Sequence, residues 1–546
     1  MTNIKAKIGH FVKGEILSDK DTIFQYSHDA SLFEVKPEVV VFPKDTEDIK
    51  SIVRYVSENK KRNPNLSVTV RAAGSCMAGG SLNESIILDI TKHISGIESF
   101  SNNTVSVLPG TFYRDFEVET LKRNLILPCY TASKNLCAIG GMIGNNAAGE
   151  KTLRYGKMEN FIESLSVIFS DGNEYEVRPL SRTDLFKKIN QNDFEGNIYK
   201  RIWNIIEKNR DEIEKARPKV SKNSAGYYIW NVWDGKTFDL TKLVVGSQGT
   251  LGVVTKATLS LVPVRKTSKL FVIFLKDLKP LAKLVNEILL FKPESLESYD
   301  DATLKLALRF FPEMLKSMKV KNFLKLILAF LPEAGLVLRG GIPKLILLAE
   351  FSGDNEKEID ETMRNLKQAV SHFGLKTHVA QSKEESEKYW TIRRESFNLL
   401  RKHVKGRRTA PFVDDVIVLP EHLPEFLPKM RKILDSYKLT YTIAGHAGNG
   451  NFHVIPLMDM TNPVNKKIIL AVSDQIYDLV AKYHGSITAE HNDGIIRTPF
   501  LEKMYNPKTL SIFRQIKEIF DPHNIFNPGK KTGISIDYLE DHLAAH

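Results

Sequence analysis

Three short segments rich in glycine, alanine and serine constrain the fold of this chain more than any other feature of its sequence. They span residues 71–81, 140–149 and 246–253. Segments with few Cβ atoms let backbone N–H groups approach a ligand closely, as the binding of a pyrophosphate group requires. One such segment alone would more often be a structural turn. Three of them predict that a single elongated ligand lies along the segments.

The first segment follows an alternation of strand and helix. Residues 39–42 predict a buried strand that a proline ends, and Asp45 then caps a helix whose apolar residues recur at helical spacing. Strands are also expected at 68–70 and 86–88, on either side of the segment, and at 243–245, before the third segment. No Gly-Lys-Ser/Thr sequence closes the first segment and no long helix is expected after it, which argues against the phosphate-binding motifs of ATP and NAD proteins.

Over residues 37–263 the three segments resemble the FAD-binding domain of the vanillyl-alcohol-oxidase-type flavoproteins. The resemblance implies that the first segment contacts the pyrophosphate, the second the flavin, and the third the adenosine and ribityl parts of FAD. The third segment commonly contains glutamate where this chain has Gln248. The residues expected to contact FAD are Arg71, Ala72, Ala73, Gly74, Ser75, Gly79, Gly80, Ser81, Gly140, Gly141, Gly144, Asn145, Asn146, Gly149, Gly246, Gly249, Thr250, Gly252 and Val253.

The cofactor is expected to be bound without a covalent link. Some relatives attach FAD through a histidine in or near the first segment, and no histidine lies between Arg71 and Ser81. Cys129 and Cys137 are the alternatives for a thioether, but a small buried cysteine is the more common case. We therefore predict non-covalent FAD.

Two histidines flank a predicted β-hairpin turn. Residues 443–454 predict a strand, a tight Asn-Gly turn and a second strand, with His446 and His453 on either side of the turn. A later glycine-flanked segment supplies Glu490 and His491 at the expected end of a strand. Two imidazoles and one carboxylate are a common ligand set for Zn²⁺ or another divalent metal, with a coordination position left for substrate. The pattern predicts a divalent metal site, most typically for zinc.

These motifs, GHAGNGNFH and AEHNDG, resemble the C-terminal domain of the FAD-linked oxidases, a family that includes D-lactate, glycolate and D-2-hydroxyglutarate dehydrogenases. The resemblance implies oxidation of a D-2-hydroxy acid by hydride transfer to flavin N5, while the metal lowers the pKa of the hydroxyl group and a base removes its proton. It assigns His446, His453 and Glu490 as metal ligands, His491 as the base and Asn451 as a substrate contact. Relatives more often have a glycine directly before the Glu-His pair, so the identity of the substrate stays open.

A cation is expected to hold the substrate carboxylate, and arginine can bind it with two parallel hydrogen bonds. Arg393 is the candidate, because its helix begins with a capping-box pattern at Ser382 and Glu385 and contains a W-x-x-R sequence similar to the family's. Arg394 is expected to point about 100° away from it and to stay outside the site. Tyr227 resembles a substrate-side tyrosine of the family.

The sequence predicts an α+β protein of several domains. Beyond residue 263, strands at 270–275 and 344–351 alternate with helices, which indicates a second α+β domain. The expected order is a two-part vanillyl-alcohol-oxidase-type FAD-binding domain, a substrate or cap domain with an antiparallel sheet, and a C-terminal helix over 501–520 that packs back on the first domain. The predicted ranges are 1–36 for an N-terminal extension, 37–265 for the FAD-binding domain, 266–500 for the cap domain and 501–546 for the C-terminal helical segment.

Charge and cysteine content bear on the partners. The formal net charge of +12 suits an anionic substrate, an acidic partner protein or an anionic membrane surface. No helix-turn-helix, zinc-finger or aromatic RNA-binding pattern accompanies it, so nucleic acid is not expected as a partner. Three cysteines without a CxxC pair argue against an Fe–S cluster on this chain. Residues 411–416 resemble dehydrogenases that carry a fused Fe–S module, so electrons are expected to pass to a separate Fe–S protein or to quinone.

The protein is expected in the cytoplasm, because no apolar run has the length of a signal-peptide core or of a membrane span. Residues 304–343 interleave apolar and basic residues, which fits either ordinary core helices or peripheral contact with the inner face of a membrane. A homodimer is one assembly compatible with the sequence. Two other functions stay open. One is a catalytically silent flavin-binding subunit of an electron-transfer complex, and the other is a flavin-dependent alkyl transferase, which should lack the His446, His453 and Glu490 set.

Overall fold

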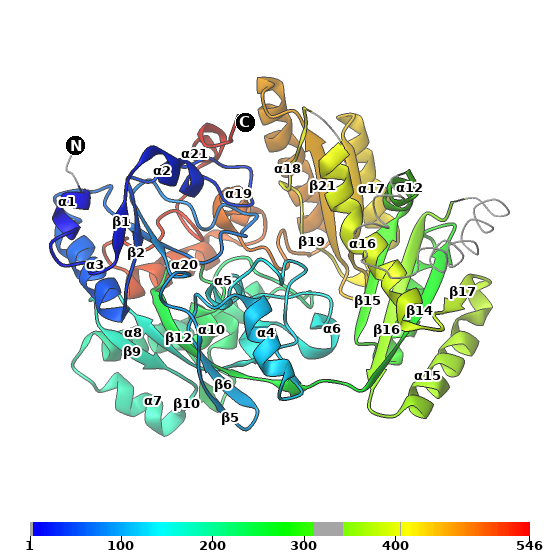
Figure 1. Ribbon diagram of the computed structural model, residues 1–546, viewed down its shortest axis with the longest axis horizontal. Coiled ribbons are helices and arrows are strands. Elements are labelled where there is room, and N and C mark those ends of the chain that lie inside the picture. Colours follow the sequence, from blue (N-terminus) through cyan, green and yellow to red (C-terminus); the bar gives the residue numbers. More distant parts are fainter. Residues whose placement is uncertain (1–3, 310–341, 404–405, 546) are drawn as a thin grey trace.

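The computed structural model describes residues 4–309, 342–403 and 406–545. Figure 1 shows two bodies side by side, one formed by the N-terminal half of the chain and the other by a large sheet with helices against it. The C-terminal residues return to the first body, where α19 (Gly494–Arg497) and α20 (Pro507–Phe520) lie among elements from the N-terminal half. Helices and largely antiparallel sheets are combined in both bodies, so the predicted α+β class is confirmed.

The first body begins with a four-stranded sheet in the order β1 (Glu15–Leu17), β2 (Val39–Phe42), β4 (Ile86–Asp89) and β3 (Val68–Arg71). Strands β2 and β3 each run parallel to β4. Helix α3 (Thr46–Asn59) starts where the Asp45 carboxylate accepts a hydrogen bond from the backbone N–H of Asp48 at 3.1 Å. The predicted strands and the capped helix are therefore present, and the first small-residue segment follows β3 directly.

A second, antiparallel sheet completes the first body, in the order β5 (Ile97–Ser101), β6 (Thr104–Val107), β12 (Val253–Ser260), β8 (Ile162–Ile168) and β9 (Glu174–Val177). The third small-residue segment leads directly into β12, the central strand of this sheet. Pairing on both sides of β12 fixes one end of that segment.

The second body is built on an eight-stranded antiparallel sheet, in agreement with the sheet expected for the cap domain. Its main order is β17 (Lys376–Val379), β14 (Thr267–Leu275), β16 (Leu345–Gly353), β15 (Ser295–Asp300), β20 (Thr440–His446), β21 (Asn451–Met458) and β18 (Arg408–Thr409), and β19 (Val416–Ile417) also pairs with β21. Strands β20 and β21 are the predicted hairpin. Helices α15 (Glu356–Ala369), α16 (Lys383–His403) and α17 (Leu423–Ser436) lie along this sheet (Figure 1).

The first part of the second small-residue segment is helical, and residues 146–149 follow it without regular secondary structure. The helical part belongs to α5 (Ile139–Asn145), although glycine is among the least favourable residues inside a helix. Close packing explains one of its glycines, because a Cβ at Gly140 would lie 2.9 Å from the Cβ of Pro109. The composition therefore reports close approach to neighbours and not the absence of regular structure.

Two further elements also differ from the prediction. Most of the residues expected as a strand at 243–245 lie in the short helix α10 (Thr241–Val244), and directly before it Asp239 Oδ1 accepts hydrogen bonds from the N–H and the hydroxyl of Thr241. The helix expected over 501–520 begins only at α20, where the side chain of Asn506 accepts a hydrogen bond from the N–H of Thr509 at 2.9 Å.

The C-terminal segment closes the first body through Asn527. Its amide nitrogen donates to the carbonyl oxygens of Gly80 at 2.8 Å and of Gln248 at 2.6 Å. Its amide oxygen accepts from the hydroxyl of Thr69 at 2.8 Å. The first and third small-residue segments are therefore tied together by a residue near the end of the chain.

The predicted amphipathic segment falls largely outside the described residues, because residues 310–341 are not among them. Its first residues form the end of α12 (Asp301–Arg309). Within the described ranges, no helix combines the length and the apolar composition that a membrane span needs.

Candidate active site

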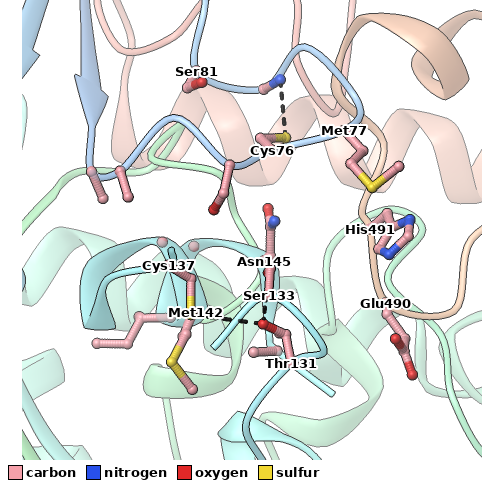
Figure 2. A pocket seen from close by; sticks show the side chains of 18 of the residues that line it. Cys76, Met77, Ser81, Thr131, Ser133, Cys137, Met142, Asn145, Glu490 and His491 are labelled. Atoms are coloured by element: carbon pink, nitrogen blue, oxygen red, sulfur yellow. Dashed lines mark hydrogen bonds between the residues drawn. The ribbon is translucent and has the colours of Figure 1, made fainter. Parts of the chain in front are cut away.

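A cavity of about 450 Å³ lies where the two bodies meet. Residues of all three small-residue segments and of the histidine cluster form its wall. Figure 2 shows the loop with Cys76 and Ser81 on one side of the cavity, Asn145 of α5 on the other, and Glu490 with His491 at one end. The fold therefore places the two predicted groups of residues in a single pocket.

Most of the residues predicted to contact FAD line this cavity: Ala72, Ala73, Gly74, Ser75, Gly80, Ser81, Gly140, Gly141, Gly144, Asn145, Gly149, Gly249 and Gly252. The others lie outside its wall: Arg71, Gly79, Asn146, Gly246, Thr250 and Val253. The Asn146 amide oxygen accepts a hydrogen bond from the N–H of Glu159 at 3.0 Å, and the Thr250 hydroxyl donates to the carbonyl of Ser247 at 2.8 Å. Both side chains stabilise the segments from behind.

Gly141 faces the open space of the cavity. A Cβ built on it would come no closer to another residue than 3.6 Å, the distance to the Cβ of Ala72. A Cβ at this position would therefore make only an ordinary van der Waals contact within the protein. The glycine keeps one side of α5 free for a ligand.

The glutamine that departs from the family pattern joins three parts of the site. The Gln248 side-chain oxygen accepts a hydrogen bond from the N–H of Gly494 at 2.8 Å, and its nitrogen donates to the side-chain oxygen of Asn145 at 3.4 Å. Gln248 also has a positive φ of 54°. An uncharged amide therefore supplies both a donor and an acceptor, where an ionised carboxylate could only accept.

His446, His453 and Glu490 come together at one end of the pocket. Their ligand atoms lie within 4.8 Å of one another, and His446 Nε2 is 3.1 Å from Glu490 Oε1. The two histidines come from β20 and β21, as the hairpin pattern predicts. Glu490 lies in a loop that a single bridge between Ile417 and Ser486 precedes, and not at the end of a strand.

Each of these three side chains has a charged partner that the sequence did not reveal. The closest contacts are 2.6 Å between His446 Nδ1 and Glu297 Oε1, 3.0 Å between His453 Nδ1 and Asp414 Oδ1, and a contact of the Lys222 Nζ with Glu490 Oε1. All three partners are buried. They come from distant positions in the chain, so no local spacing could have identified them.

His491 is held by the second oxygen of Asp414, which lies 2.7 Å from His491 Nδ1. Burial lowers the pKa of His491, but the charges of Asp414 and Asp415 outweigh burial and raise the pKa to about 9. One carboxylate oxygen of Asp415 also accepts the backbone N–H groups of residues 489, 490 and 491 at 2.9, 2.8 and 2.7 Å. Asp414 and Asp415 therefore fix both the ring and the backbone of His491.

Both adjacent arginines line the cavity, which corrects the expectation that Arg394 stays outside it. The buried Arg393 pairs with Glu297 through Nη2. Arg394 Nη2 donates to both carboxylate oxygens of Glu150 at 2.8 Å. Adjacent residues of a helix point about 100° apart, but both side chains are long enough to reach the pocket from α16.

Asn451 and Tyr227, the expected substrate contacts, do not reach the wall of the cavity. The Asn451 side-chain nitrogen donates to Asp415 Oδ1 at 3.1 Å and to the carbonyl of Val416 at 3.2 Å. The hydroxyl of Tyr227 lies 2.7 Å from that of Thr250. Both side chains are almost fully buried, and their polar groups connect elements behind the wall.

A second cavity, of about 470 Å³, lies between β14, β16 and the start of α16. Glu350 is in its wall, together with Glu294 and Lys151, whose side chains are 3.0 Å apart. Burial and the charge of Glu294 raise the pKa of Glu350 to about 7. The ionised form of this carboxyl group is therefore unfavourable in the folded protein.

Replacing Glu350 with glutamine should raise the melting temperature at about pH 8, by roughly 2 °C. The pKa of about 7 lies above the ordinary value of 4.5, so the folded protein retains a proton that the unfolded chain releases between these values. The protonated Glu350 makes its full contribution to the free energy of unfolding below about pH 4.5, and this contribution is lost as the pH rises through the pKa of about 7. Differential scanning fluorimetry should therefore show little change at about pH 4.5. Glu361→Gln, at an exposed position of α15, is the control, and it should leave the melting temperature unchanged at both pH values.

Two known domain families match this chain, in the same order along the sequence as the two bodies of the fold. Residues 37–178 match the FAD binding domain, and residues 265–531 match the C-terminal domain of FAD linked oxidases. The protein is also similar to 4-ethylphenol oxidase from Gulosibacter chungangensis, with a TM-score of 0.68 and 14% identity over 98% of this chain and 97% of that one. This likeness confirms the predicted two-part, vanillyl-alcohol-oxidase-type fold.

Two curated relatives illustrate the range of similar sequences. D-2-hydroxyglutarate dehydrogenase of Pantoea ananatis is 28% identical over 92% of this chain and 49% of its own length. The glycolate oxidase subunit GlcD of Bacillus subtilis is 25% identical over 92% of this chain and 91% of its own. The chain thus spans about half the length of the first of these relatives. The chain therefore carries, in the same order as the two bodies, a region that matches the FAD binding domain and a region that matches the C-terminal domain of FAD linked oxidases.

Proposed function

We propose that the protein oxidises a D-2-hydroxy acid to the corresponding 2-oxo acid and passes the electrons through FAD to a separate acceptor. One observation supports this most strongly: the histidine and carboxylate cluster opens onto the same cavity as the three small-residue segments. A hydroxy acid bound at the cluster would lie beside a flavin held by the segments. Substrates of the D-lactate, D-2-hydroxyglutarate and glycolate class fit the names of the relatives.

The small-residue segments fit non-covalent FAD. Gly141 leaves space for a ring system beside one wall of the cavity, and small residues of the loop after β3 line the cavity, as a pyrophosphate-binding loop requires. Burial raises the pKa of both Cys129 and Cys137, which keeps their thiols protonated and poor nucleophiles. When bound, FAD supplies the acceptor for the hydride of the substrate.

The cluster also fits a divalent cation. Four carboxylates line or support the pocket: Glu150, Glu297, Asp414 and Glu490. Three cations pair with some of them: Lys222, Arg393 and Arg394. These charges leave no surplus of positive charge for an anionic substrate. A divalent metal such as zinc, held by His446, His453 and Glu490, would supply that charge and polarise the substrate hydroxyl group.

His491 is the proposed base. Its Nδ1 lies against Asp414, which leaves Nε2 as the ring atom that can accept the hydroxyl proton. Because the pKa of His491 is about 9, only the neutral form of the ring, which is favoured above that pH, acts as the base. The carboxylate then stabilises the resulting imidazolium. Loss of this proton and of the hydride at the α-carbon turns the alcohol into the carbonyl of the 2-oxo acid. Arg393 and Arg394, which both line the cavity, are the proposed contacts of the substrate carboxylate.

The metal cluster and the His491–Asp414 pair weigh against the two alternative functions. An alkyl transferase has no need of the three converging ligand atoms, and a silent subunit has no need of a base held by a buried carboxylate. For the electrons we propose a separate Fe–S protein or quinone as acceptor, since the three cysteines are free and dispersed. A homodimer and a peripheral position on the inner face of a membrane remain proposals of the same kind.

Anaerobic addition of the correct hydroxy acid should bleach the visible absorption band of the bound flavin, and prior chelation should abolish the bleaching. The experiment compares D-lactate, D-2-hydroxyglutarate and glycolate, with Zn²⁺ added back after chelation as the control. Restoration by Zn²⁺ would support the metal role. Bleaching that chelation does not change would remove that role, and a flavin that none of the three acids bleaches would favour the silent subunit.

A further inference from the structure

Two buried carboxylates each connect a proposed metal ligand with a second residue of the pocket. Asp414 contacts His453 with one oxygen and His491 with the other, at 3.0 and 2.7 Å. Glu297 contacts His446 with Oε1 at 2.6 Å and Arg393 with Oε2. The side chains of both carboxylates are only 1% exposed. On each side of the site, one buried carboxylate therefore bridges a proposed metal ligand and a second residue of the pocket.

The sheet fixes the position of Glu297. Strand β15 pairs with β20 at Ser298 and Gly445, so Glu297 and His446 are the next residues in the same register. The N–H of Gly448, in the turn after β20, donates to the carbonyl of Leu296 at 2.9 Å. Backbone contacts on both sides thus hold the carboxylate against the imidazole, independently of any ligand.

The contact determines which nitrogen of His446 can bind a metal. A carboxylate is only an acceptor, so His446 Nδ1 must carry the hydrogen that faces Glu297. Nε2 then keeps its lone pair, and it lies on the side of Glu490. A hydrogen bond to the non-coordinating nitrogen is the usual way in which proteins orient a histidine ligand.

The second carboxylate oxygen of Glu297 contacts the guanidinium group of Arg393. The arginine is buried, and its Nη2 contacts Glu297 while the side chain lines the cavity. Its Nε has no hydrogen-bond partner among the described residues. Part of the guanidinium group is therefore committed to Glu297, and donors remain for a substrate carboxylate.

We infer that Glu297 is a positioning residue that orients His446 for the metal and Arg393 for the substrate carboxylate, and thereby links the two binding events. This inference rests on the proposed function of the site. Glu297 itself does not line the cavity, so its effect passes through the two residues that it holds.

The test is a titration of Zn²⁺ into the chelator-treated, flavin-containing protein, followed by calorimetry in the absence of substrate. Glu297→Gln should weaken Zn²⁺ binding about 10–100-fold. Glu297→Asp, which keeps the charge but cannot reach both partners, should also weaken it. Glu294→Gln is the matched control, because Glu294 is equally buried, lies three residues earlier and pairs with Lys151 at 3.0 Å. An unchanged flavin spectrum verifies the fold of each variant.

A second titration uses pyruvate, with the shift of the flavin spectrum as the readout. Arg393→Lys should weaken pyruvate binding and leave Zn²⁺ binding unchanged, whereas Glu297→Gln should weaken both. If Glu297→Gln binds Zn²⁺ as tightly as the unaltered protein, the inference is overturned and the proposed function stands. If the unaltered protein does not bind Zn²⁺, the proposed metal role fails and the inference fails with it.

Discussion

Replacing His491 with alanine should slow the anaerobic reduction of the bound flavin by a hydroxy acid by about 10²–10⁴-fold, the usual contribution of a positioned base. The ring lies in the wall of the cavity, and Asp414 and Asp415 hold it from behind. Alanine removes the proton acceptor but none of the proposed metal ligands. Stopped-flow absorbance under anaerobic conditions measures the rate directly.

The content of FAD and of metal should be unchanged in this variant, which separates loss of the base from loss of the site. His523→Ala is the matched control, because His523 is exposed in a turn of the C-terminal segment. It should reduce the flavin at the normal rate. A His491→Ala protein that still reduces its flavin at an undiminished rate would assign the base to another residue.

Substitutions of increasing size at Gly141 should test whether α5 faces the bound cofactor or packs against the protein. Gly141→Leu should abolish FAD binding, because the side chain would fill the space that the cavity leaves beside α5. Gly141→Ala adds one methyl group where the nearest atom is 3.6 Å away, and it should lower the affinity only slightly. Alanine should also stabilise the helix itself by roughly 0.5–1 kcal/mol. Flavin fluorescence after denaturation measures the cofactor content.

Far-UV circular dichroism of the cofactor-free variants provides the control for folding. Both should give the spectrum of the unaltered protein, since a Cβ at this position comes no closer to Ala72 than 3.6 Å and the position lies in the wall of the cavity. A leucine variant that retains a full complement of FAD would show that the flavin does not lie against α5. The interpretation of the second small-residue segment would then have to be revised.

Local patterns in the sequence were sufficient for several parts of the site. The Asn-Gly turn places His446 and His453 on neighbouring strands, and a hairpin needs no information from elsewhere in the chain. Asp45 at the start of α3 is likewise a local signal. The family motifs added Glu490 and His491, whose loop has no regular pattern of its own.

The partners of those residues depend on contacts between distant strands and could not be predicted in this way. Glu297 reaches His446 only because β15 lies beside β20, which are 149 positions apart at this contact. Lys222 contacts Glu490 from 268 positions away. The prediction for Arg394 was wrong for a different reason. The direction of a Cα–Cβ bond does not determine where the end of a long side chain lies. The same limit applies to α5, where composition alone could not separate a loop from a closely packed helix.

The hydrogen bonds of Asn527 also bear on the order in which parts of the protein assemble during synthesis. It joins Gly80 to Gln248 and accepts from Thr69, across separations of 447, 279 and 458 positions. Synthesis delivers the N-terminal residues first, so both loops leave the ribosome long before the residue that joins them. A nascent chain halted before residue 527 would lack these three hydrogen bonds. Capture of the dinucleotide should therefore be a late event of biogenesis, after the cap has already been made.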